Sequence, residues 1–170
     1  MFGGDRPVEL FVPSSYDPAT PMPLVLLLHG YGVSGQVQEW IFKLKPEAEA
    51  RGFLYAYPNG TEDSDLHNFW NATDACCNFK GSTVDDSAYL EGLIAEIKGK
   101  YTVDPRRVFL TGHSNGAFMA HRMACDHADT IAAIAAFAGV LWEDTSKCQP
   151  SEPVHVLQIH GTADTTIAYA

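Results

Sequence analysis

The sequence predicts an α/β fold with a doubly wound, mainly parallel sheet. Apolar strand-like segments alternate with helix-like segments along the chain, and this alternation gives right-handed crossovers with helices on both faces of a sheet. The chain has 170 residues, 46% of them hydrophobic, which suits one domain with a substantial core. No linker or internal repeat interrupts it, so we expect residues 1–170 to form a single domain.

The first half of the chain contains three expected strands and one expected helix. Residues 8–12 are a short candidate strand. Residues 24–28 form a continuous apolar run, which is typical of a parallel strand covered on both faces. Residues 36–51 have a helical pattern that ends at Gly52, a favourable C-cap. Residues 53–57 are the third candidate strand, closed by a turn sequence.

The second half opens with a polar, aromatic-rich stretch at residues 61–83, which is long enough to be a functional loop. A helix is expected at residues 85–101, where apolar residues recur at helical spacing. Asp85 and Asp86 would lie at the positive N-terminus of that helix, which explains them without a catalytic role. The remaining expected elements are a strand at 107–110, a helix at 117–125, and strands at 131–137 and 154–159.

The four cysteines bear on the cellular compartment. Their spacing fits no zinc motif, and a bridge between the adjacent Cys76 and Cys77 would be strained. We therefore expect disulfides from this pair to Cys125, Cys148 or both, which implies an oxidising compartment. A secreted or periplasmic location is expected. Four free thiols in a cytoplasmic protein are the alternative.

Charge and hydropathy exclude two classes of partner. The chain has 11 Lys and Arg against 21 Asp and Glu, and this balance argues against nucleic-acid binding, which needs clustered positive charge. The longest apolar run, residues 24–28, is far shorter than the roughly 20 residues that a membrane helix requires. We therefore expect neither a nucleic-acid nor a membrane partner.

The sharpest motif is G-x-S-x-G at residues 112–116. It lies between an apolar strand and a helix that opens with small residues, which is the setting of a nucleophile elbow. The glycines permit a tight, strained turn that raises Ser114 above the sheet. The N-terminus of the following helix points its amides at the place where negative charge would develop. Ser114 is the candidate nucleophile, with a passive serine in a glycine-rich turn as the alternative.

Two further segments follow strands and would lie at the same sheet edge. After residues 24–28 comes a small-residue loop in which the backbone amide of Tyr31 could join that of Asn115 as oxyanion donors. His29 in this loop is a weaker candidate for the base than for a residue that orders the loop. Asp164, just past the last strand, is the candidate orienting acid or else a turn aspartate.

Several segments together resemble the polyhydroxybutyrate depolymerase and feruloyl esterase-like group of α/β-hydrolases. The resemblance implies a serine carboxylic ester hydrolase that acts on a small ester without a metal or organic cofactor. It makes Ser114 the nucleophile, Asp164 the triad acid, and the amides of Tyr31 and Asn115 the oxyanion hole. Members of the group are often secreted and disulfide-bonded. The matching segments are residues 23–30, 76–77, 84–86, 101–108, 112–116 and 160–167.

The base histidine of that group would follow the triad acid, yet all seven histidines of this chain precede Asp164. The sequence resembles an α/β-hydrolase that lacks the last strand and helix. Loss of the base lowers the turnover of such an enzyme by about six orders of magnitude. Two alternatives to a complete hydrolase are therefore a scaffold with little or no turnover and a site completed by a neighbouring chain.

Assembly and substrate contacts give the last expectations. The strand at residues 154–159 would leave an open sheet edge, so we expect a homo-oligomer pairing there. Such a pairing could bring His67, His127 or another histidine of one chain towards Ser114 of another. Phe69 and Trp70 in the long loop either line a substrate pocket or pack the loop onto the domain.

Overall fold

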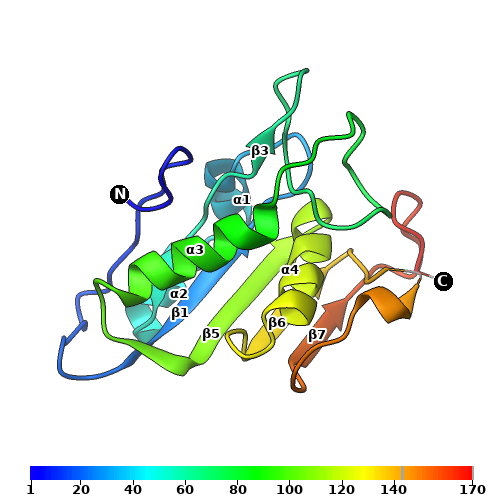
Figure 1. Ribbon diagram of the computed structural model, residues 1–170. Helices are drawn as coiled ribbons and strands as arrows, with labels where there is room; N and C mark the ends of the chain where they lie inside the picture. The colour runs from blue at the N-terminus through cyan, green and yellow to red at the C-terminus, as the bar shows by residue number, and fades with distance from the viewer. Residues whose placement is uncertain (143, 170) are drawn as a thin grey trace.

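The computed structural model describes residues 1–142 and 144–169. Its centre is a five-stranded sheet in the order β2-β1-β5-β6-β7, and every neighbouring pair is parallel (Figure 1). This arrangement confirms the predicted doubly wound parallel sheet. The strands are β1 (Met22–Leu28), β2 (Leu54–Ala56), β5 (Val103–His113), β6 (Ala133–Phe137) and β7 (His155–Ile159).

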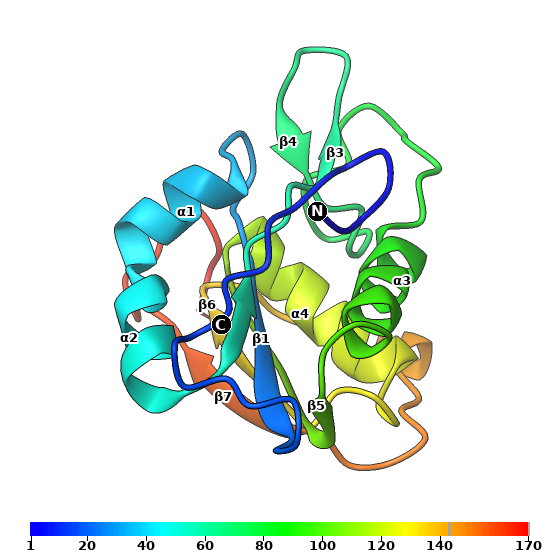
Figure 2. The same cartoon turned by 90° about the vertical axis from the view of Figure 1, so that its left-hand side faces the viewer.

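Helices cover both faces of the sheet. Figure 2 shows α1 (Gly35–Phe42) and α2 (Leu44–Arg51) on one side, and α3 (Asp86–Lys98) and α4 (Asn115–Asp126) on the other. In β1, Leu24, Leu26 and Leu28 enter the main core, whereas Leu27 packs in a second cluster with Tyr55. Both faces of β1 are therefore buried, which is why its sequence shows no polar alternation. No helix of the described residues is long and apolar enough to cross a membrane.

The helix expected at residues 36–51 is broken in two. Lys43 adopts a left-handed conformation with φ 54° and ends α1, and α2 begins at the next residue. The Glu39 carboxylate accepts the backbone amides of Leu44 and Lys45 at 3.2 and 3.0 Å, so it caps the second helix. Pro46 lies in the first turn of α2, where its missing N–H costs nothing, whereas a continuous helix would lose a hydrogen bond there.

Two other segments differ from expectation. Residues 8–12 are not a strand, because they make only two isolated bridges, Val8 with Phe2 and Phe11 with Tyr55. Within residues 61–83 the chain forms a two-stranded antiparallel ribbon of β3 (Thr61–Glu62) and β4 (Asn68–Phe69). This ribbon projects above the sheet edge where β1 and β5 end (Figure 2).

Asp85 and Asp86 have separate roles at the start of α3. Asp85 caps the helix by accepting the amide of Ala88 at 3.0 Å, as its position predicts. Asp86 is fully buried and pairs with Arg6 at 2.5 Å. It also accepts the amide of Asn71 at 2.7 Å, so it fastens the N-terminal segment and the long loop to α3. The helix dipole alone therefore does not explain Asp86.

The disulfides differ from the expected pairing. Cys76 is bonded to its neighbour Cys77, and Cys125 at the end of α4 is bonded to Cys148. Disulfides are present as predicted, but the prediction that they join the Cys76–Cys77 pair to Cys125 or Cys148 is wrong. Cys77 adopts φ 79°, a left-handed conformation that the sequence alone does not reveal. The Cα atoms of Cys125 and Cys148 lie 5.1 Å apart, within the usual range for a disulfide.

Candidate active site

Ser114 lies at the turn between β5 and α4, with φ 52° and ψ −122°. Non-glycine residues rarely adopt this conformation, and it matches the strained elbow that the motif predicts. Two glycines make the turn possible. A Cβ on Gly112 would lie 2.3 Å from the carbonyl oxygen of Gly116, and one on Gly116 would lie 2.2 Å from that of Leu28. A larger side chain at either position would therefore push β1, β5 and α4 apart.

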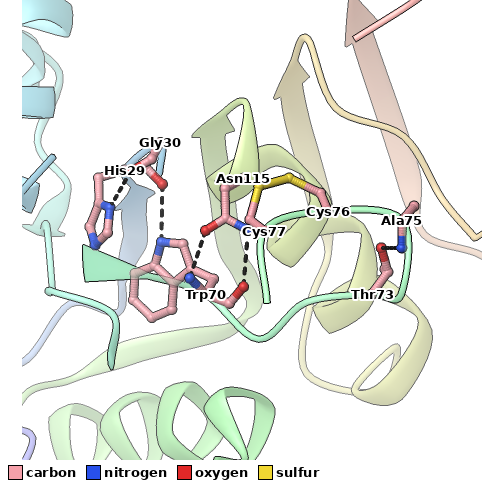
Figure 3. Close-up of a disulfide and its surroundings, with 8 residues drawn as sticks. All are labelled: His29, Gly30, Trp70, Thr73, Ala75, Cys76, Cys77 and Asn115. Atoms are coloured by element: carbon pink, nitrogen blue, oxygen red, sulfur yellow. Dashed lines mark hydrogen bonds between the residues drawn. A yellow bond between two sulfur atoms is a disulfide. The ribbon is translucent and has the colours of Figure 1, made fainter. Parts of the chain in front are cut away.

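The side chain of Asn115 anchors the long loop beside the elbow. It is fully buried, and its Oδ1 accepts the amide of Trp70 at 2.6 Å while its Nδ2 donates to the Trp70 carbonyl at 2.9 Å (Figure 3). The backbone N–H of Asn115 belongs to the first turn of α4, where amides have no acceptor within the helix. Its side chain thus fixes the loop, and its amide is available for an anionic oxygen.

The loop after β1 is held at successive residues. The ring of His29 donates from Nδ1 to the Gly30 carbonyl at 2.7 Å and accepts the Gly60 amide on Nε2 at 2.8 Å. The Gly30 amide donates to Gln38 Oε1 at 3.1 Å, and Trp70 Nε1 donates to the His29 carbonyl at 3.1 Å (Figure 3). These contacts support the loop-ordering role of His29 rather than the role of base.

Gly30 brings this loop against the elbow. A Cβ on Gly30 would lie 3.6 Å from the Cβ of Ser114 and 3.4 Å from Nδ1 of His113. Tyr31 is the next residue along the chain. Its backbone amide is therefore one residue away from the contact between Gly30 and the elbow. Its phenol donates to Asp63 Oδ2 at 2.9 Å and lies 3.2 Å from Nδ1 of His67, which ties the loop to the β3–β4 ribbon.

The buried ring of His29 predicts a pH dependence of stability. Burial lowers the pKa of His29 to about 4, against about 6.5 in an unfolded chain. Between these pH values the unfolded chain binds a proton that the folded chain does not, so folding stability is greatest above pH 6.5 and falls as the pH drops towards 4. We expect His29 to contribute a loss of about 3 kcal/mol over that window, measured by urea unfolding.

A neutral substitution provides the control for this prediction. His29→Gln keeps a hydrogen-bonding amide but cannot titrate, so its unfolding free energy should fall less steeply between pH 6.5 and 4. All other ionisable groups are the same in the two proteins, so their contributions cancel in the comparison. Equal slopes for the two proteins would show that His29 does not have the lowered pKa.

Asp164 follows β7 at the same edge of the sheet as the elbow. Its Oδ1 accepts the amides of Ile167 at 3.0 Å and Thr166 at 2.8 Å, and these hydrogen bonds lower the pKa of Asp164. Oδ2 lies 3.7 Å from Nε2 of His160. Burial lowers the pKa of His113, the residue before Ser114, and the negative charge of Asp164 opposes this effect. The Asp164 carboxylate therefore influences the electrostatics next to Ser114. Oδ1 of Asp164 thus holds the turn, and Oδ2 is left for a further hydrogen-bond donor.

No histidine of the described residues hydrogen-bonds to Ser114 Oγ. His121 is buried, with Nε2 3.0 Å from Gln158 Oε1, and His127 Nε2 lies 3.0 Å from Ser87 Oγ. These two histidines are held by contacts within their own chain. His160 donates from Nε2 to the carbonyl of Ile167 at 2.8 Å and supports the Asp164 turn.

Phe69 and Trp70 pack the long loop onto the domain. Their side chains are 1% and 0% exposed, so they favour the packing alternative over the pocket-lining one. A cavity of about 550 Å³ instead involves Phe79 and Trp142, which we did not single out from the sequence. Both residues lie outside the expected helices and strands. In a loop, the sequence pattern does not indicate whether an aromatic side chain is exposed or buried.

Comparison with known proteins identifies the family. Residues 9–170 match the family model described as phospholipase/carboxylesterase. The chain belongs to this family. The chain is 34% identical over 149 residues to a putative esterase NocK of Nocardia uniformis subsp. tsuyamanensis, covering 86% of this chain and 42% of that protein. It is 30% identical over 171 residues to feruloyl esterase B of Piromyces equi, covering 96% of this chain and 30% of that protein.

Solved structures similar to this chain confirm the α/β-hydrolase fold. An acetyl xylan esterase from Aspergillus awamori superposes with a TM-score of 0.73 at 19% identity, over 95% of this chain and 69% of that one. A thermostable esterase gives the same TM-score and identity over 95% of this chain and 44% of that one. The chain spans less than half the length of the two curated relatives above.

Proposed function

We propose that this phospholipase/carboxylesterase chain carries the nucleophile of a serine carboxylic ester hydrolase, and that Ser114 forms the acyl-enzyme. The observation that carries the proposal is the strained elbow, with φ 52° and ψ −122° at Ser114. Strain of this kind persists where function requires it. The match to the family model and the esterases among the relatives support the same class of reaction.

The proposed chemistry follows from the positions around the elbow. Ser114 Oγ attacks the ester carbonyl, and its proton passes to a base and then to the departing alkoxide, which leaves as the alcohol. The amides of Tyr31 and Asn115 stabilise the oxyanion, aided by the N-terminus of α4. Asp164 orients the protonated base with Oδ2. Water then attacks the acyl-enzyme by the same route and releases the acid.

A second candidate function is a hydrolase scaffold with little or no turnover. The observation that favours it is that none of the histidines in the described part of the chain hydrogen-bonds to Ser114 Oγ. Hydrolysis then needs a base from elsewhere, and a second copy of the chain is one source. His67 has a half-exposed side chain and is the more accessible candidate base, whereas His127 is largely buried.

Covalent labelling with a fluorophosphonate tests the proposed nucleophile. The chain offers a matched control in Ser87, whose Oγ lies 3.0 Å from His127 Nε2 and 2.8 Å from Asp126 Oδ2. Ser87 has a histidine within hydrogen-bond distance, but it is only 3% exposed in the first turn of α3, so the reagent should not reach it. We expect one adduct, on the peptide containing Ser114, which Ser114→Ala removes and Ser87→Ala leaves. An adduct on Ser87, or none at all, would contradict the proposal.

The relatives and the disulfides support a finer proposal on substrate and location. Relatives of this chain are named feruloyl esterase and bifunctional acetylxylan esterase/xylanase, and these names support a small carboxylic ester as substrate. All four cysteines are paired in disulfides. Disulfides persist in oxidising environments, which supports a secreted or periplasmic protein.

We also propose that a second copy of the chain pairs with the edge strand β7. Within the described residues β7 has a strand neighbour on one side only, β6. Its apolar side chains on both faces are exposed, with Val156 at 51% and Leu157 at 57%. An open edge with exposed apolar side chains favours association with another strand. A two-fold dimer is the simplest closed assembly.

Sedimentation velocity at micromolar concentration tests the dimer. We expect the wild-type chain to sediment as a dimer and Leu157→Lys to return a monomer, because a lysine at an edge strand opposes pairing. Leu66→Lys, at a leucine that is 75% exposed between β3 and β4, is the control and should stay dimeric. A monomeric wild-type chain would rule out association through β7.

A further inference from the structure

The two backbone amides proposed for the oxyanion hole lie beyond the hydrogen-bonded end of the sheet. The parallel pairing of β1 with β5 ends where Leu28 lies opposite Gly112. Tyr31 and Asn115 each follow this last pair by three residues. The sheet therefore does not fix the spacing of the two amides, although both must lie within about 2.7–3.1 Å of one anionic oxygen. A contact outside the sheet has to set that spacing.

Trp70 contacts both of the segments that carry these amides. Its indole Nε1 donates to the carbonyl of His29 at 3.1 Å, two residues before Tyr31. Its backbone amide donates to Asn115 Oδ1 at 2.6 Å, and its carbonyl accepts from Asn115 Nδ2 at 2.9 Å (Figure 3). Among the described residues, Trp70 alone forms hydrogen bonds with both segment 29–31 and segment 114–116.

Trp70 is itself held firmly in place. Its side chain is fully buried, and its ring packs against that of His29 with centroids 5.0 Å apart. The amide of the next residue, Asn71, donates to the buried carboxylate of Asp86 at 2.7 Å. Gly60 leaves room for the indole, since a Cβ there would lie 3.2 Å from Trp70 Cδ2. A link fixed in this way needs no reordering when negative charge develops, which is what oxyanion stabilisation requires.

We propose that Trp70 is a positioning residue that sets the distance between the Tyr31 and Asn115 amides. Its buried side chain is not exposed to substrate, so it acts through the two segments that it joins. No group of the described residues accepts a hydrogen bond from either amide, which leaves both for an anionic oxygen. This inference rests on the proposed function, in which these amides form the oxyanion hole.

The chain carrying Ser114→Cys allows oxyanion stabilisation to be measured without a base. All four native cysteines are paired in disulfides, so the introduced thiol is the single free one. Its thiolate, formed at mildly alkaline pH, is the nucleophile for two reagents. With p-nitrophenyl acetate it forms a thioester through an oxyanion and releases p-nitrophenolate. With iodoacetamide it forms a thioether and releases iodide, and no oxyanion develops.

The measured quantity is the ratio of the two second-order rate constants, ester over iodoacetamide. The thiolate fraction and the access to the thiol enter both rate constants, whereas the oxyanion amides act on the ester reaction alone. A merely structural role of Trp70 would change folding or access and would leave the ratio unmoved. N-acetylcysteine gives the ratio for a thiol without a protein site, and Ser114→Ala gives the background release of p-nitrophenolate.

Trp70→Phe, made in the Ser114→Cys chain, removes the indole N–H and keeps a buried ring. We expect Ser114→Cys to give a higher ratio than N-acetylcysteine, and Trp70→Phe to lower that ratio about ten-fold or more, because displaced donors stabilise the oxyanion less. Phe69→Leu, at the neighbouring aromatic residue that is 1% exposed, is the matched control and should leave the ratio unchanged.

A second change at position 70 guards against a folding defect in Trp70→Phe. Benzothienylalanine keeps the size of the indole and replaces its N–H by sulfur, so it should also lower the ratio. A raised ratio that neither change at position 70 alters, or an equal loss in Phe69→Leu, would overturn this inference alone. A ratio for Ser114→Cys no higher than that of N-acetylcysteine would instead contradict the proposed oxyanion hole, and this inference with it.

Discussion

Where an assembled site supplies Ser114 with a base, replacement of Ser114 by alanine should reduce the hydrolysis of p-nitrophenyl acetate by up to about six orders of magnitude in kcat. The residual rate would come from binding and from the oxyanion amides, which the substitution leaves in place. No described residue hydrogen-bonds to Ser114 Oγ, and alanine meets the same backbone strain as serine at φ 52°. Folding should therefore be unchanged, and thermal unfolding monitored by circular dichroism checks this.

The control for this experiment is Ser87→Ala, which should keep the wild-type turnover, since Ser87 lies in α3 away from the elbow. Its Oγ contacts His127 and Asp126, so a stability loss of about 1 kcal/mol is expected without an effect on kcat. A wild-type chain that hydrolyses the ester no faster than Ser114→Ala would contradict the enzyme proposal. The scaffold alternative would then be favoured.

Local constraints explain why the sheet and the elbow could be predicted from the sequence. The apolar run in β1 reports burial on two faces, and Leu26 and Leu27 indeed enter different clusters. Gly112 and Gly116 flank Ser114 because the close backbone contacts there exclude a Cβ. Each of these signals is contained within a few residues of chain.

Features that depend on residues far apart in the chain could not be predicted. The pairing of Cys125 with Cys148 follows from how the segment after β6 packs on α4, and spacing alone leaves it open. Asp86 marks a helix start in sequence, but its burial depends on Arg6, 80 residues away. The cavity lined by Phe79 and Trp142 likewise forms only once the loop of residues 71–79 is placed.

The contact between Gly116 and β1 should be the most sensitive single position for stability. An alanine Cβ there would lie 2.2 Å from the carbonyl oxygen of Leu28 and 2.6 Å from that of His29, both rigid backbone atoms. α4 would have to move away from the end of β1, which opens the core and displaces the elbow. We expect Gly116→Ala to cost more than about 3 kcal/mol, a large part of the 5–15 kcal/mol typical of a domain.

Gly92 provides a matched comparison for this substitution, because it also lies within a helix. It is exposed on α3, and a Cβ there meets no atom within 4 Å. Alanine gains about 0.5–1 kcal/mol of helix propensity over glycine at both sites. Gly92→Ala should therefore raise the urea midpoint slightly, whereas Gly116→Ala should lower it steeply or prevent folding. Both substitutions gain the same kind of helix propensity. The difference in unfolding free energy between the two variants therefore measures the steric contact of α4 with β1. Similar stabilisation by the two substitutions would show that this contact is not as close as the elbow requires.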